Sequence, residues 1–298
     1  MVTGDFHGMP TRRLENQHLR LEYLSEAGPR IVRVFLGDSN QNLLVELPTA
    51  TISTPIGDYH LRGGHRLWHS PEVMPRTYVP DDAGVKVEEL PEGVRLIGPT
   101  EALTGIQKSI EIHLRADRPS MTLRHELRNN GVWPVELAPW AITQLPLGGV
   151  AILPQQVGPL DATGLLPNRQ LVLWPYTRWS DPRLQLAEDY ILLQAQPLQP
   201  PCKVGYLNRR GWVAYWRERV LFVKRFSSRP AAPHADFGCN AEFYCNDAFI
   251  EMETIAPLTT LDPGQSVEHV ETWEFHSGID APRTVESVRA LVNSLSLG

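Results

Sequence analysis

Short stretches in which apolar and polar residues alternate dominate the chain. Between positions 110 and 114, Ile, Ile and Leu alternate with Glu and His, and between 123 and 128 Leu, His and Leu alternate with Arg, Glu and Arg. Because successive side chains of a strand point to opposite faces, this period of two predicts adjacent, half-buried antiparallel strands. The same pattern predicts further strands near residues 18–24, 30–36, 84–90, 93–98, 134–146, 190–195, 211–217, 220–226, 247–256 and 266–275.

Two segments depart from the strand pattern. Apolar residues recur at helical spacing at the C-terminal end, after Pro282, which predicts one helix. Its apolar positions are Val285, Val288, Leu291, Val292 and Leu295. The segment 151–189 is rich in loop-forming residues and carries Trp174, Tyr176 and Trp179, which is typical of an insertion or of the rim of a binding site. A domain boundary there is the alternative, and we expect one all-β domain over residues 1–298.

Composition excludes several function classes. Of the 298 residues, 42% are hydrophobic and 21% are charged, with a net charge of -6, which fits a folded core under an ordinary soluble surface. A pI near 5.9 without a Lys/Arg cluster argues against a nucleic-acid partner, and acidic substrates are not favoured either. The sequence lacks phosphate-binding glycine loops, Gly-x-Ser-x-Gly elbows, His-Glu-x-x-His motifs and EF-hand loops. The enzyme classes that depend on those motifs are therefore not expected.

Cellular location is predicted from three further observations. No run of about 18 apolar residues is present, so we expect no membrane span. The N-terminal residues do not have the basic and apolar regions of a signal peptide. Cys202, Cys239 and Cys245 are an odd number and form no disulfide framework. Together these features predict a reducing, cytoplasmic environment and no membrane partner.

The first candidate site is a pair of glutamates in one predicted strand. Glu251 and Glu253 are two residues apart, so a strand places both on one face, and Ile250 and Met252 then require a core on the other. Two neighbouring carboxylates raise the pKa of at least one of them, which makes a useful proton acceptor near neutral pH. The alternative is a polar strip that faces solvent.

The second candidate site is the dense segment 62–72. It contains Gly63, Gly64, His65, Arg66, Trp68, His69 and Glu72. Paired glycines allow a ligand to approach the backbone, Arg66 is a forked donor for hydroxyls or a carboxylate, and Trp68 is a stacking surface. His65 and His69 are four residues apart outside any predicted helix, so zinc is disfavoured and we expect neither metal nor cofactor. Ordinary use in turns and core is the alternative.

Further candidates lie in the aromatic-rich stretch 203–226 and in the segment 240–246. The first is interpreted as a β-meander from which Lys203, Trp212 and Lys224 reach a pocket. In the second, Glu242 and Asn246 have the donors and acceptors that sugar hydroxyls require. The alternatives are solvated cations, core rings and an ordinary turn after Asn246.

Three of these segments resemble a known family. The stretch 251–275 contains a Glu-x-Glu strand, a Pro-Leu exit, a Leu-x-Pro-Gly turn and a strand with Glu-x-Trp near its end. This order resembles the C-terminal strand pair of galactose-mutarotase-like proteins, especially an uncharacterised bacterial branch. Gly63–Trp68 with Pro71-Glu72, and Lys203-Val204-Gly205, are similar to the same branch. The resemblance implies a galactose-mutarotase-like β-supersandwich of antiparallel sheets with a sugar site on its concave face.

The resemblance also implies a chemistry. In aldose 1-epimerases a strand Glu takes the proton of the anomeric hydroxyl while a His protonates the ring oxygen, and Glu253 matches that Glu by local pattern. The family's Asn-His-x-Tyr-Phe motif is absent, since the comparable strand, 138–144, contains no His. His65 or His69 would have to replace it.

The leading hypothesis is therefore a sugar isomerase that acts at the anomeric carbon of a small sugar or oligosaccharide. Glu253 is its base, Glu251 is the pKa partner or an acceptor for sugar hydroxyls, and Arg66, His65 and Trp140 shape the pocket. A non-catalytic carbohydrate-binding module, or a structural protein on the same fold, is the alternative.

Overall fold

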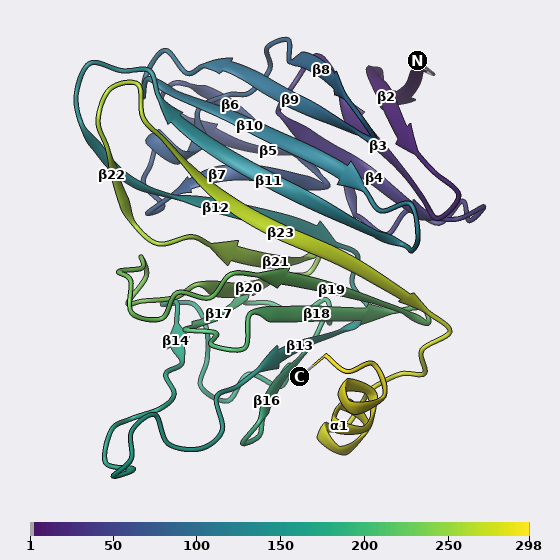
Figure 1. Ribbon diagram of the computed structural model, residues 1–298, viewed down its shortest axis with the longest axis vertical. Coiled ribbons are helices and arrows are strands. Elements are labelled where there is room, and N and C mark those ends of the chain that lie inside the picture. Colours follow the sequence, from purple (N-terminus) through teal and green to yellow (C-terminus); the bar gives the residue numbers. More distant parts are fainter. Residues whose placement is uncertain (1–2, 298) are drawn as a thin grey trace.

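The computed structural model describes residues 3–297, which form two large antiparallel sheets, one hairpin and one α-helix (Figure 1). The order in the eleven-stranded sheet is β1 (Thr3–Phe6), β2 (Met9–Glu15), β3 (Leu19–Leu24), β4 (Arg30–Leu36), β7 (His65–Ser70), β12 (Val135–Leu145), β21 (Ile250–Ile255), β20 (Ala241–Cys245), β17 (Cys202–Tyr206) and β14 (Val172–Leu173), with β22 (Thr259–Leu261) paired to β12. The order in the ten-stranded sheet is β15 (Leu184–Leu186), β16 (Tyr190–Gln194), β13 (Val150–Pro154), β18 (Trp212–Arg217), β19 (Val220–Phe226), β23 (Ser266–Ser277), β11 (Ser120–Asn129), β10 (Ile106–Leu114), β9 (Gly93–Thr100) and β8 (Lys86–Leu90). A 3₁₀ turn, Arg76–Tyr78, follows β7.

The core lies between the two sheets. Each sheet turns one set of alternate side chains inward, so Leu21 and Met252 of one sheet belong to the same apolar cluster as Ile110, Leu123 and Phe275 of the other. Such two-sheet packing buries the apolar half of every alternating strand. The all-β prediction is confirmed, and each predicted strand is present, two of them, 30–36 and 220–226, with identical bounds.

The predicted C-terminal helix is also present, as α1 (Val285–Ser294). Thr284 caps it, because its Oγ1 accepts a hydrogen bond of 3.2 Å from Ser287 N. Val285, Val288 and Val292 pack on the outer face of the ten-stranded sheet, and Figure 1 shows the helix in yellow beside β13 and β16. No helix within residues 3–297 is long and apolar enough to cross a membrane.

Two sequence predictions need correction at this level. The stretch 203–226 is not one meander, because β17 lies in the eleven-stranded sheet whereas β18 and β19 pair in the ten-stranded sheet. The hairpin β5 (Glu46–Thr54) and β6 (Gly57–Gly63) escaped prediction, since most of β5 is at least partly exposed and has no apolar stripe. The segment 151–189 is irregular apart from the end of β13 and the short strands β14 and β15.

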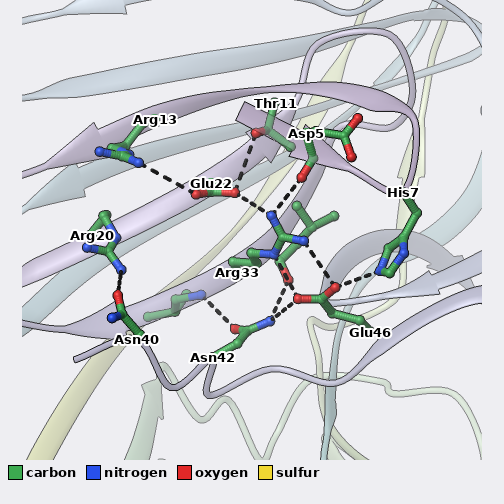
Figure 2. Close-up of polar contacts among 12 residues, drawn as sticks. Asp5, His7, Thr11, Arg13, Arg20, Glu22, Arg33, Asn40, Asn42 and Glu46 are labelled. Atoms are coloured by element: carbon green, nitrogen blue, oxygen red, sulfur yellow. Dashed lines mark hydrogen bonds and ion pairs between the residues drawn. The ribbon is translucent and has the colours of Figure 1, made fainter. Parts of the chain in front are cut away.

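An ion-pair cluster fixes the base of that hairpin (Figure 2). Arg33 of β4 donates to both oxygens of Glu46, at 2.7 and 3.1 Å, and to Glu22 Oε2 at 2.9 Å. His7 Nε2 lies 2.7 Å from Glu46 Oε2. Burial alone would raise the pKa of Glu46, but the hydrogen bonds from Arg33 and His7 outweigh it and lower the pKa to about 2. The hairpin is thereby tied to β4 by a carboxylate that stays ionised.

Candidate functional site

A cavity of about 550 Å³ opens on the outer face of the central strands of the eleven-stranded sheet. This size is typical of small-molecule sites. Its floor consists of Arg66 and Trp68 of β7, Trp140 of β12, Glu251 of β21, Tyr244 of β20, and Pro201 and Lys203 at β17. Its walls come from the β5–β6 hairpin and from three loops and contain Ala50, Ile52, Leu61, Glu72, Tyr78, Tyr176, Asn246, Ala248 and Phe249.

Strand register explains how residues far apart in sequence meet on this floor. Directly paired residues of neighbouring strands point to the same face of a sheet. Gln144, Glu251, Tyr244 and Lys203 are paired in succession across β12, β21, β20 and β17. The adjacent row runs through Arg66, Ile142, Glu253 and Glu242 in the same way. The sheet thus places three glutamates between an arginine and a lysine.

Glu251 is the carboxylate that lines the cavity, and it is held through one oxygen. Its Oε1 accepts hydrogen bonds from Arg66 Nη2 at 2.9 Å and from Gln144 Nε2 at 3.0 Å. The Arg66 guanidinium lies over the Trp68 ring, 4.1 Å from its centroid. These donors fix the orientation of the carboxylate and leave its second oxygen for a ligand.

Glu253 and Glu242 lie beneath this layer, on either side of Lys203. Glu253 Oε2 accepts from Trp140 Nε1 at 2.8 Å and from Lys203 Nζ at 3.1 Å, while Lys203 Nζ is also 2.8 Å from Glu242 Oε2. The ammonium group lies 4.8 Å and 4.6 Å from the ring centroids of Trp140 and Trp174. One buried cation therefore holds two buried carboxylates and two aromatic faces together.

Burial shifts the proton affinities of this cluster. Burial raises the pKa of Glu251. The positive charge of Arg66 opposes this increase, and the negative charge of Glu253 adds to it. Burial also raises the pKa of Glu242 to about 8 in spite of Lys203. For Lys203, burial lowers the pKa, but the attraction of Glu242 and Glu253 exceeds that effect and raises it well above the usual range. Two carboxyl groups here have an unusual affinity for protons.

Several buried polar atoms of the cluster have no hydrogen-bond partner among residues 3–297. They are Nε and Nη1 of Arg66, Oε1 of Gln144 and Oε1 of Glu253. Buried polar atoms in folded proteins are nearly always paired, and exceptions concentrate where water or a ligand binds. The unpaired atoms belong to the strands that form the cavity floor, so the cluster has unused donors and acceptors at a candidate binding site.

Comparison with solved structures identifies the fold. A galactose mutarotase-like protein from Lactobacillus casei superposes with a TM-score of 0.57 at 10% identity, covering 89% of this chain and 100% of its own. A galactose mutarotase related enzyme from Lactobacillus acidophilus superposes with a TM-score of 0.52 at 11% identity. The match covers 91% of this chain and 99% of the enzyme. This chain has the galactose mutarotase-like fold. The resemblance noted in the sequence is therefore confirmed at the level of fold.

The same fold occurs inside a larger neighbour. A TPR-domain containing protein from Parabacteroides distasonis matches with a TM-score of 0.62 at 12% identity over 93% of this chain, which spans 50% of that protein's length. No protein-family model and no curated protein matches the sequence. At such low identities the galactose mutarotase-like fold is shared, and the chemistry has to be argued from the site.

On this galactose mutarotase-like scaffold, most of the predicted binding residues line the cavity. They are Arg66, Trp68, Glu72, Trp140, Lys203, Asn246 and Glu251. Glu242 and the predicted base Glu253 are fully buried beneath it and connect to it through Lys203. Trp212 and Lys224 do not reach the cavity: Trp212 packs in the apolar cluster under α1, and Lys224 lies between the sheets.

Both predicted catalytic histidines point away from the cavity. They alternate with Arg66 and Trp68 along β7 and so project from the opposite face of the sheet. His65 Nε2 lies 2.8 Å from His125 Nε2 in the sandwich interior, and His69 Nε2 lies 3.5 Å from Glu101 Oε2. Neither side chain is in position to protonate a ligand on the cavity floor, and the two do not meet each other.

One potential metal-binding group does lie between the sheets. Ligand atoms of His65, His125 and Glu271 are within 4.8 Å of one another. They are already engaged, because the two imidazoles bond to each other and Lys224 Nζ lies 3.0 Å from Glu271 Oε1. The positive charge of the Lys224 ammonium group, so close to Glu271, repels a metal cation at this place.

Sequence reasoning missed several lining residues. Loop position or register brings to the cavity the side chains of Tyr78, Tyr244 and Phe249. Register also brings Gln144 to Glu251. Nothing in their local sequence distinguishes these four residues from core or turn residues. Tyr176 was expected only as part of a rim segment, and it does line the cavity. Tyr78 also donates to Glu72, which joins two wall residues.

Proposed function

We propose that this protein binds a neutral sugar in the cavity and interconverts its anomers, with Glu251 as the base. The observation that carries the proposal is the position of Glu251: its carboxylate lies on the floor, anchored through Oε1 by Arg66 and Gln144. Aromatic rings around it suit the apolar faces of a pyranose. Arg66 and Lys203 are balanced by Glu251 and Glu72 along the lining, which favours an uncharged ligand.

The chemistry is a proton transfer followed by ring opening. Glu251 accepts the proton of the anomeric hydroxyl, the C1–O5 bond breaks as the C1 carbonyl forms, and the ring oxygen gains a proton. Rotation about C1–C2 and the reverse steps give the other anomer. A raised pKa, as burial produces at Glu251, suits a group that must accept and then return a proton near neutral pH.

The proton for the ring oxygen has to come from a group other than histidine. Lining residues other than those that hold Glu251, with N–H or O–H donors, include Lys203, Tyr176 and Tyr244. Burial raises the pKa of Tyr176 and Tyr244, so both hydroxyls remain protonated. Lys203 supplies the positive charge that stabilises an oxyanion developing at the ring oxygen. The assignment of the base to Glu253, made from the sequence, is the alternative within this proposal.

A second candidate function is sugar binding without turnover. One observation favours it: His65 and His69 face the interior, so the imidazole that aldose 1-epimerases use has no counterpart on this floor. In this case Arg66, Glu251 and Lys203 serve only as partners of sugar hydroxyls.

One experiment separates the two. Binding of glucose, galactose, mannose and xylose is measured by calorimetry, and exchange between α and β anomers is measured by NMR with and without protein. We expect at least one aldose to bind and its anomers to exchange faster with protein. Binding without acceleration would establish the second candidate, and absence of binding to any aldose would contradict both.

A reducing, cytoplasmic location is part of the proposal. It is supported by Cys202, Cys239 and Cys245, which are all buried and free. The reaction moves only protons, so it calls for no cofactor.

A further inference from the structure

Two exposed aromatic side chains lie next to the cavity. Trp179 is 81% exposed and Phe237 is 90% exposed, although both belong to well-anchored loops. Large aromatic rings stabilise a protein mainly when they are buried, so rings displayed beside a binding site indicate a surface for a ligand.

The Trp179 loop is continuous with the cavity wall. Trp179 follows Tyr176, a lining residue, by three positions, so their Cα atoms are at most about 11 Å apart. Thr177 fixes the loop to the floor strand, since its Oγ1 makes hydrogen bonds of 2.8 Å with Lys203 O and with Lys203 N. At the other end of the loop, Arg183 Nη2 donates a hydrogen bond of 2.7 Å to Asp181 Oδ2. The ring of Trp179 is thus displayed from a segment held at both ends.

The Phe237 loop lies near Lys203, because the Lys203 charge acts on the neighbouring Asp236. Burial raises the pKa of Asp236, and Lys203 opposes this increase. Asp236 and Phe237 have φ angles of +50° and +58°, a conformation that costs free energy in residues other than glycine. Hydrogen bonds from Gly238 N and Cys239 N to Ala235 O, at 2.8 and 3.0 Å, hold this turn. The backbone therefore displays Phe237 at a conformational cost.

The two loops touch each other. Gln170 Nε2, from the segment that leads to Trp174 and Tyr176, donates to Phe237 O at 3.2 Å. This bond joins the two segments that carry the exposed rings (together, the rim), beside the paired strands β14, β17 and β20.

We propose that the cavity takes the terminal sugar of an oligosaccharide and that Trp179 and Phe237 stack on the sugars that follow. This inference rests on the proposed sugar site and adds the class of its ligand. The two rings supply flat apolar faces, which suit the apolar faces of the sugars in a glycan.

The test compares monosaccharides with trisaccharides of the same sugar. Calorimetry is performed with glucose, maltotriose and cellotriose, and with galactose and β-1,4-galactotriose. Wild-type protein should bind one trisaccharide about 10-fold or more tightly than its monosaccharide. Trp179→Ala and Phe237→Ala should each weaken the trisaccharide about 3- to 10-fold and leave the monosaccharide unchanged.

Trp133→Ala is the matched control, because Trp133 is 79% exposed in the loop between β11 and β12 and does not line the cavity. It should change neither affinity. Equal binding of both sugar lengths, or rim variants that bind the trisaccharide like wild type, would overturn the rim proposal and leave the cavity proposal intact. Rim variants that alter only self-association would make the rim a protein interface instead, and absence of all binding would contradict both proposals.

Discussion

Two polar clusters lie back to back across the same strands and differ in how their charges are used. The cavity cluster comprises Arg66, Gln144, Lys203, Glu242, Glu251 and Glu253 on the outer face. The interior cluster comprises His65, His125, Thr143, Lys224, Thr254, His269, Glu271 and Trp273 between the sheets. Both are buried, and both combine acidic and basic side chains.

The interior cluster is saturated with hydrogen bonds. His125 Nδ1 lies 3.0 Å from His269 O, and a carbonyl only accepts, so Nε2 of His125 accepts from His65. Glu271 accepts from Trp273 Nε1 at 2.7 Å, from Lys224 Nζ at 3.0 Å and from Thr254 Oγ1. Burial would raise the pKa of Glu271, but the positive charge of Lys224 opposes this most strongly and the pKa is lowered. Such a network stabilises the pairing of the two sheets.

The cavity cluster shows the opposite electrostatics. The pKa values of Glu242 and Glu251 are raised, so their surroundings disfavour the charged form, and Arg66, Gln144 and Glu253 retain unpaired atoms. A protein that only needed stability would have replaced these groups with apolar ones. The comparison teaches that the same residue types satisfy one another in the interior, whereas on the outer face they keep unpaired atoms and raised carboxyl pKa values. Glu-to-Gln substitutions on the two faces test this directly.

Glu271→Gln should have the largest effect. It removes a carboxylate that holds Lys224, which leaves a fully buried ammonium without its charge partner. We expect the free energy of unfolding to fall by about 3–5 kcal/mol, measured by urea denaturation.

Glu268→Gln is the control for this prediction, because Glu268 lies on the same strand but pairs at the surface with Arg124. It should cost less than about 1 kcal/mol. Equal effects of the two substitutions would remove the distinction between interior and surface pairs.

Acidification should also lower the free energy of unfolding, through the histidines of the interior cluster. Burial lowers the pKa of His65, His125 and His269, the last to about 3, so the folded protein binds fewer protons than the unfolded chain below pH 6.5. The stability these neutral rings contribute is fully present above pH 6.5 and is lost as the pH falls towards 3.

Replacing His269 with Gln should make the fall between pH 6.5 and 4.5 shallower by about 2 kcal/mol. His113→Gln, a change at a partly exposed ring, is the surface control for this substitution. Parallel profiles for wild type and the His269 variant would show that this ring does not titrate with unfolding.

Glu242→Gln should change the pH dependence of stability in the opposite direction. The folded pKa of Glu242 is raised to about 8, so its protonated form stabilises the protein fully below about pH 4.5, and this contribution is lost as the pH rises through 8. The Gln variant should therefore gain about 3 kcal/mol relative to wild type as the pH rises from 5 to 8. A variant that instead loses stability over this range would mean that Glu242 is ionised in the folded protein.

Much of the fold was predictable because alternation reports burial of one face. β10, β11 and β23 have one apolar and one polar side, and the sequence located them directly. The face shared by Glu251 and Glu253 followed from the same rule, and Ile250 and Met252 do lie in the core.

The remainder required three-dimensional information. All six residues of β7 are buried, so no apolar stripe showed that His65 and Arg66 lie on opposite sides of the sheet. Lys203 joins Glu242 and Glu253 only through the order β21, β20, β17, which hydrophobic periodicity does not encode. The hydrogen bonds that exclude His65 from the cavity come from the other sheet, through His125.

The account is tested most directly by measuring anomer exchange and unfolding free energy together for Glu251→Gln, using an aldose that wild type converts. The variant should keep the stability of wild type within about 1 kcal/mol, because the site disfavours the charged form, and should lose about 100-fold or more of the exchange rate. A variant that exchanges anomers at the wild-type rate but unfolds several kcal/mol more easily would show that Glu251 serves the fold and not the reaction.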